Sequence, residues 1–136
     1  MQNADSPSAR GARAEAAVAS ALVRSGATVF APVFGGNGRI DLVYERRGAL
    51  VRVQCKTACQ IGGALRFWTC SNTGNLPQPY YDEVDEFAVY SPDTGLVYLI
   101  PAADTPSRAC FLRLQPTRNG QRSGVRWAAD FELGPP

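Results

Sequence analysis

The chain has 136 residues, of which 45% are hydrophobic and 19% charged, a composition typical of a globular protein rather than a disordered chain or coiled coil. This length predicts a single domain over residues 1–136. No apolar run approaches the roughly 18 residues that a membrane span needs, so we expect a cytoplasmic protein. The sequence contains no histidine, which excludes Ser-His-Asp and Cys-His catalysis and histidine-based zinc sites. Acid–base or metal chemistry must therefore use carboxylates, amides, lysine, tyrosine or cysteine.

Charge and cysteine content narrow the function only slightly. The formal net charge of +2 permits nucleic-acid binding without requiring it. Of the 14 basic residues, 13 are arginine and one is lysine, Lys56, which raises the question of what that position requires. The four cysteines lie at positions 55, 59, 70 and 110, and no two of them form a CxxC pair. We interpret them as reduced thiols, with a zinc site as the alternative.

The first predicted element is a helix of about 19 residues. Ser6 is a plausible N-cap, Pro7 suits the first helical position, and Gly26 is a C-terminal stop. Glu15 lies seven residues before Leu22, which places both side chains on nearly the same side of the helix. The pattern therefore predicts that the Glu15 carboxylate points toward the edge of the core.

After the helix, the hydrophobic pattern changes to a period of two, which is typical of strands. Strands are predicted over residues 28–34, 40–45, 50–57, 65–70, 86–90 and 96–100. The proline-rich stretch 77–82 is predicted to begin a short helical turn. A last hairpin is predicted between residues 111–114 and 125–128, around Asn119-Gly120.

The second and third predicted strands form a hairpin whose register determines which side chains are neighbours. If residues 46–49 make a four-residue loop, paired residue numbers sum to 95, and Asp41 lies opposite Gln54. Lys56 follows on the same face, while Cys55 points into the core from the other face. A slip of one residue would separate this cluster, so the prediction depends on the register.

These residues carry chemistry that would suit a metal site. Glu15, Asp41 and Gln54 supply two carboxylates and an amide oxygen, and the Cys55 backbone carbonyl lies beside them; such hard ligands suit Mg²⁺, with Mn²⁺ as a substitute. Lys56 can orient or deprotonate a water and offset charge on a phosphate. The competing interpretation is that Asp41 is a turn residue and the others are solvated surface groups.

Three stretches resemble the PD-(D/E)XK nuclease superfamily: residues 11–15 with Glu15, 38–43 with Asp41, and 51–58 with the Gln54-x-Lys56 motif. The Q-x-K variant, the tyrosine-rich segment 80–90 and the strand ending at residue 101 are similar to the subgroup that contains a cyanobacterial group I intron homing endonuclease. The resemblance covers residues 8–101 and leaves a basic C-terminal extension, 102–136. Arg39-Ile40 stands before Asp41 where the superfamily name has proline.

The resemblance implies an α/β fold of restriction-endonuclease type, with a mixed central β-sheet flanked by α-helices. It also implies a Mg²⁺-dependent endodeoxyribonuclease of homing or restriction type, from a prokaryote or phage. In such an enzyme Glu15, Asp41, Gln54 and the Cys55 carbonyl would hold the metal, and Lys56 would serve the attacking water.

Further expectations concern DNA and assembly. The candidate DNA contacts are Arg39, Arg52, Arg66, Ser71 and Tyr80. A domain this small covers little duplex, so cutting both strands would need a homodimer or homotetramer. Two alternatives stay open: a structure-selective nuclease similar to Holliday-junction resolvases, and a catalytically silent DNA- or protein-binding domain.

Overall fold

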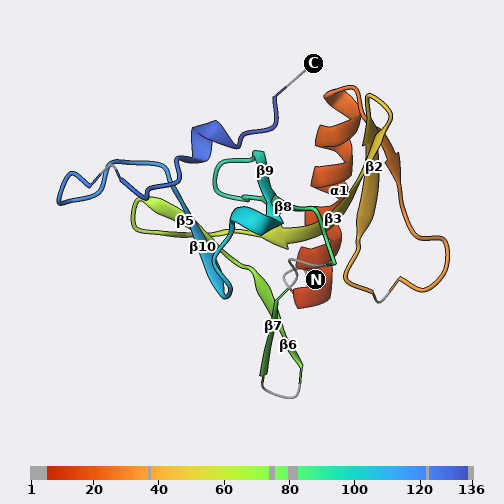
Figure 1. Cartoon of the computed structure of the whole chain (residues 1–136), viewed down its shortest axis with the longest axis horizontal. Coiled ribbons are helices and arrows are strands. Elements are labelled where there is room, and N and C mark those ends of the chain that lie inside the picture. The colour runs from red at the N-terminus through yellow and green to blue at the C-terminus, as the bar shows by residue number, and fades with distance from the viewer. Residues whose placement is uncertain (1–5, 37, 74–75, 80–82, 122, 135–136) are drawn as a thin grey trace.

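A mixed five-stranded sheet forms the centre of the molecule in the computed structural model, which describes residues 6–36, 38–73, 76–79, 83–121 and 123–134. The sheet order is β1-β2-β3-β8-β9; β3 and β8 are parallel, and the other neighbours are antiparallel. The strands are β1 (Thr28–Phe30), β2 (Leu42–Arg46), β3 (Ala49–Thr57), β8 (Glu86–Tyr90) and β9 (Val97–Pro101). The mixed central sheet expected from the sequence is confirmed (Figure 1).

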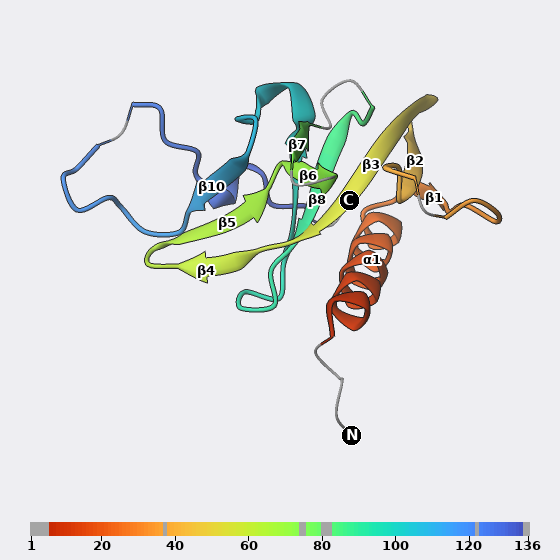
Figure 2. The same cartoon turned by 90° about the horizontal axis from the view of Figure 1, so that it is seen from below.

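The central sheet is covered on both faces. Helix α1 (Pro7–Arg24) packs on one face, where Val18 and Leu22 join a core with residues of β2, β3 and β8. A second sheet, with the order β10-β5-β4, covers the other face, and Leu65 and Phe67 pack there against β8 and β9. Its strands are β4 (Cys59–Ile61), β5 (Ala64–Trp68) and β10 (Ala109–Arg113). Figure 2 shows β4 leading away from the end of β3.

Helix α1 has the ends that the sequence predicted. The Ser6 hydroxyl accepts a hydrogen bond from the Ala9 N–H at 3.1 Å, and Pro7 is the first helical residue. The helix ends at Arg24, and Gly26 has a φ of +98°, the left-handed conformation that commonly terminates a helix. None of the helices in the described part of the chain is long and apolar enough to cross a membrane.

The β2–β3 hairpin has the predicted register but a tighter turn. Arg46 pairs with Ala49 and Leu42 with Val53, so paired numbers sum to 95. The loop consists of Arg47 and Gly48 rather than four residues. Both have positive φ, +54° and +82°, as a two-residue hairpin of type I′ requires.

Several predicted strand boundaries were wrong. The strand over 28–34 ends at Phe30, just before Ala31 and Pro32. The strand over 65–70 divides into β5 and β6 (Cys70–Thr73), and strand β4 was not predicted. Short strands such as β4 carry too few residues for a clear alternation, and here pairing with β5 determines the structure.

The predictions for 77–82 and for the last hairpin were also wrong. Residues 76–79 form β7 (Leu76–Pro79), which pairs with β6, while residues 80–82 lie outside the described residues. Strand β10 pairs with β5 rather than with residues 125–128. Arg113 makes only an isolated parallel bridge to Trp127, and Ala128 begins the short helix η2 (Ala128–Asp130). A further short helix, η1 (Ala102–Asp104), follows β9.

Candidate active site

Asp41 lies at the point where strands β2 and β3 separate. The ladder ends at Leu42–Val53, one pair before the predicted Asp41–Gln54 pair. The Asp41 N–H still donates to the Val53 carbonyl at 2.9 Å, while its Oδ2 accepts from the Cys55 N–H at 2.9 Å. The carboxylate thus takes the place of the next ladder bond, which fixes it at the end of the β2–β3 ladder.

Glu15 approaches this position from α1. It follows the buried residue Ala14 and is itself exposed. Partial burial raises the pKa of Glu15, and the negative charge of Asp41 raises it further. Burial also raises the pKa of Asp41, against the lowering effects of the Cys55 N–H and the Lys56 charge. The Asp41 charge thus disfavours the charged form of Glu15, and a cation between the two carboxylates would be stabilising.

Lys56 and Gln54 lie on the face of β3 opposite Val53 and Cys55, as predicted. Val53 and Cys55 are in the core beneath α1, and Cys55 is 9% exposed. Lys56 is half-buried, and burial lowers its pKa, while the charges of Cys70 and Asp41 oppose that change. The ammonium therefore stands close to the Asp41 carboxylate, at a half-buried position with restricted access to water.

The amide of Gln54 contains an unsatisfied oxygen. Its Oε1 is buried and has no hydrogen-bond partner among the described residues, whereas its Nε2 faces the Cys55 carbonyl at 3.4 Å. A buried oxygen without a partner costs free energy unless another group, such as a cation, occupies the space beside it. Rotation of the amide would turn Oε1 toward the Cys55 carbonyl, so that both oxygens face one point.

The donor set fits a hard divalent cation. Within the described ranges, no three Cys, Asp or Glu side chains are grouped closely enough to hold a metal. A cation would thus have the carboxylates of Glu15 and Asp41 together with the neutral oxygens of Gln54 and Cys55, and Mg²⁺ needs only one or two carboxylates. Burial raises the pKa of the Cys55 thiol well above its usual value, so this side chain is not a thiolate ligand.

The residues proposed for DNA contact have diverse environments. Arg39 forms an ion pair with Glu83 at 3.3 Å, and Arg52 is held by Asp85 through Nε and Nη2, at 3.1 and 3.0 Å. The Arg66 guanidinium lies over the Trp68 ring, 4.6 Å from its centroid. Of the two other candidates, Ser71 lies in β6, and Tyr80 falls outside the described residues.

Two residues near the site were not predicted from the sequence. Cys70 is close enough to Lys56 for its charge to influence the pKa of the lysine. Asp85 accepts the Arg52 N–H at 2.8 Å and donates its own N–H to the Arg52 carbonyl at 2.9 Å, which ties β8 to β3. Both interactions join segments distant in sequence, and no local pattern marks either residue.

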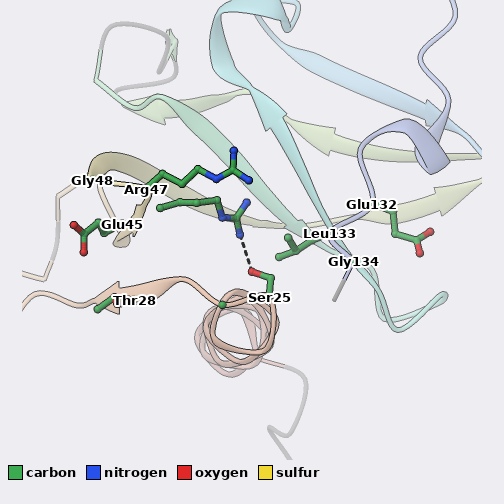
Figure 3. A pocket seen from close by; sticks show the side chains of 10 residues that line it. Ser25, Thr28, Glu45, Arg47, Gly48, Glu132, Leu133 and Gly134 are labelled. Atoms are coloured by element: carbon green, nitrogen blue, oxygen red, sulfur yellow. Dashed lines mark hydrogen bonds between the residues drawn. The ribbon is translucent and has the colours of Figure 1, made fainter. Parts of the chain in front are cut away.

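A cavity of about 790 Å³ lies elsewhere, between the end of α1, the β2–β3 turn and residues 132–134 (Figure 3). The Arg46 guanidinium crosses it and donates to the Ser25 hydroxyl at 2.7 Å. None of the four residues Glu15, Asp41, Gln54 and Lys56 lines this cavity. It is therefore separate from the candidate active site.

The fold and this cluster together define a nuclease-like α/β protein. A solved structure of a bacterial homing endonuclease, I-Ssp6803I, matches 94% of this chain and 87% of its own length, with a TM-score of 0.71 and 21% identity. At that identity the likeness shows the fold alone. The family described as PD-(D/E)XK endonuclease matches residues 6–134, so the chain belongs to that family. This confirms the resemblance seen in the sequence; no curated protein matched the chain.

Proposed function

We propose that the protein is a DNA endonuclease that hydrolyses phosphodiester bonds with Mg²⁺, or Mn²⁺ in its place. The observation that carries the proposal is the Asp41 carboxylate, fixed between β2 and β3 beside Glu15 and Lys56. Membership of an endonuclease family supports the same reaction. Divalent metals are general in this family, and bound here the ion would polarise the phosphate and lower the pKa of a water.

Each side chain of the site then has a definite role. Glu15 and Asp41 supply the negative charge that would hold the ion, and the Cys55 N–H keeps the Asp41 carboxylate in place. Gln54 supplies a neutral oxygen, which leaves the site less negative than a third carboxylate would. Lys56 holds the attacking water and balances charge that develops on the phosphate oxygens, since its ammonium is half-buried beside Asp41.

The assembly and location of the enzyme are part of the same proposal. One chain carries one Asp41 and one Lys56, so cleavage of both strands calls for a homodimer or homotetramer. We place the protein in the cytoplasm of a prokaryote, where its DNA substrate is found. A silent binding domain stays the competing possibility, because Gln54 stands where related motifs carry an acid.

The test is a plasmid-nicking assay with wild type and Asp41→Ala, in Mg²⁺, Mn²⁺ and Ca²⁺. The variant should lose cleavage while binding DNA as well as wild type or more tightly, because loss of an anion reduces repulsion of phosphate. Ca²⁺ should support binding without cleavage. Equal nicking by both proteins would place the activity elsewhere, and no nicking by wild type on plasmid, linear or four-way-junction DNA would favour the silent domain.

A further inference from the structure

The outer face of the second sheet exposes large apolar side chains. Along β5, Leu65 and Phe67 are fully buried, so Ala64, Arg66 and Trp68 point to the opposite, outer side. Phe111 of β10 pairs with Arg66, and Ile61 of β4 pairs with Ala64, which places both on that outer face. Trp68, Phe111 and Ile61 are 53%, 48% and 44% exposed. Apolar groups gathered on one face in this way indicate a binding surface.

Arg66 gives this face a positive charge that the described residues do not neutralise. Its guanidinium stacks on Trp68, its Nε is buried without a hydrogen-bond partner, and no carboxylate of the described residues forms an ion pair with it. The chain has no Asp or Glu in residues 46–81 or 105–129, the segments that build this sheet. The face therefore suits a partner that combines negative charge with flat apolar surfaces.

The face lies close to the candidate active site. Cys59 of β4 is the third residue after Lys56, about 10 Å along an extended chain, and Cys59 pairs with Arg66. From β5 the chain continues through Thr69 into β6, whose first residue, Cys70, is near Lys56. Figure 2 shows β4 and β5 beside the end of β3. The outer face and Lys56 therefore belong to neighbouring points of one continuous stretch of chain, β3 followed by β4.

We propose that this face stacks unpaired nucleobases of the DNA substrate on Trp68 and Phe111, with Arg66 supplying positive charge for the adjoining phosphates. The proposal rests on the proposed function for its DNA substrate and specifies the substrate class: DNA with a single-stranded segment next to the scissile bond, as in a flap or an opened junction. Stacking on aromatic side chains with arginine nearby is how proteins hold unpaired bases.

Two other occupants fit the face less well. In a duplex the bases are stacked inward, and the major groove admits a helix or a two-stranded ribbon rather than the face of a three-stranded sheet. A second copy of the chain, related by twofold symmetry, would set two identical faces together, each carrying Arg66 and Arg113 and neither having a carboxylate on these strands. Unpaired DNA avoids both difficulties because its phosphates and base faces are accessible together.

Binding without cleavage tests the proposal. Fluorescence anisotropy in EDTA would compare a labelled oligothymidylate with a matched duplex, using wild type, Trp68→Ala, Phe111→Ala and the conservative Trp68→Phe. Leu50→Ala is the matched control, because Leu50 is a large exposed apolar residue at the hairpin end of β3. Trp68→Ala and Phe111→Ala should each bind oligothymidylate about tenfold more weakly, with duplex binding nearly unchanged. Trp68→Phe and Leu50→Ala should remain close to wild type.

The outcomes separate the possibilities. Unchanged oligothymidylate binding by Trp68→Ala and Phe111→Ala, or equal weakening on both probes, would overturn the stacking proposal. A loss of oligomeric mass in Trp68→Ala by light scattering, with DNA binding intact, would overturn it in favour of self-association. If the expected binding pattern is found but wild type cleaves nothing, the proposed hydrolysis fails while the stacking face stands. If wild type cleaves duplex DNA but Trp68→Ala leaves oligothymidylate binding unchanged, the proposed hydrolysis stands and the stacking proposal fails.

Discussion

Lys56 is the one basic position in the chain that is not arginine, and the structure gives a physical reason for the exception. The residue is half-buried beside Asp41, and burial lowers its pKa. A lysine ammonium is compact and can lose its proton when desolvated, whereas guanidinium is wider, planar and effectively always charged. We therefore expect that the proposed chemistry uses the size and acidity of lysine rather than its charge alone.

Lys56→Arg should accordingly lose hydrolysis by about 10²-fold or more, the range of a positioned acid–base group. Single-turnover cleavage in Mg²⁺ would measure the effect, and DNA binding in Ca²⁺ would show that the variant still holds substrate. Activity within a few-fold of wild type would mean that Lys56 acts through charge only, and that another group serves the water.

A substitution at Gln54 tests the proposed metal site independently of catalysis, because the Gln54 Oε1 is buried without a partner among the described residues. Gln54→Glu adds a carboxylate near Glu15 and Asp41. We expect about tenfold tighter Mn²⁺ binding by calorimetry, together with a lower melting temperature in EDTA from repulsion among three carboxylates. Gln60→Glu, at an exposed position of β4, is the matched control and should change neither quantity. Unchanged Mn²⁺ affinity in Gln54→Glu would separate Gln54 from the metal site.

Among the elements, β3 and β8 are joined by a parallel ladder that an ion pair precedes. Asp85 accepts three hydrogen bonds from Arg52, from its N–H, Nε and Nη2, immediately before the parallel pairing of Val53 with Glu86 begins. Gln54 and Lys56 follow on the same strand, so the joint sets where they lie. The hydrogen bonds from the Arg52 side chain, and then from its backbone, lower the pKa of Asp85.

This pKa shift predicts a pH dependence of stability with a definite sign. A carboxylate whose pKa is lowered in the folded state stabilises the fold above its unfolded pKa of about 3.9 and loses that effect as pH falls through the lowered value. Asp85→Asn should thus be less stable than wild type at neutral pH, by about 1 kcal/mol or less because the pair is exposed. Urea unfolding should show the difference narrowing below about pH 4. A constant difference at every pH would contradict the assignment to this charge.

Local signals predicted some elements and failed for others, for identifiable reasons. The caps of α1 and the alternation around the hairpin are local, and the register then placed Asp41, Gln54 and Lys56 together. The tight turn was missed because Arg47 adopts a positive φ that is rare for arginine. Strands β4 and β7 and the nearness of Cys70 to Lys56 depend on how distant segments come together, which no short window of the sequence indicates.

For the whole molecule, the main constraint is that one chain holds one candidate site, so that the proposed enzyme would cut one strand at a time. Its single α-helix in the described residues and its two packed sheets leave a small body for gripping a duplex. Two linked copies would place two sites on one DNA molecule, and closed symmetry would set their spacing. Cleavage of both strands should therefore depend on assembly, while nicking should not.

Mixing experiments give the sharpest test of this dependence. If wild type assembles, a mixture with excess Asp41→Ala should form mixed oligomers with one working site, so that plasmid accumulates as nicked circles while linear product falls. Wild type alone should give linear product with little nicked intermediate. Dilution of the protein below the concentration at which it assembles should make nicked plasmid the main product. Light scattering on the same samples measures the mass. The contrary result would be a protein of monomeric mass whose yield of linear product does not change when Asp41→Ala is added. It would show that one chain cuts both strands by rebinding, because an inactive variant does not inhibit independent monomers.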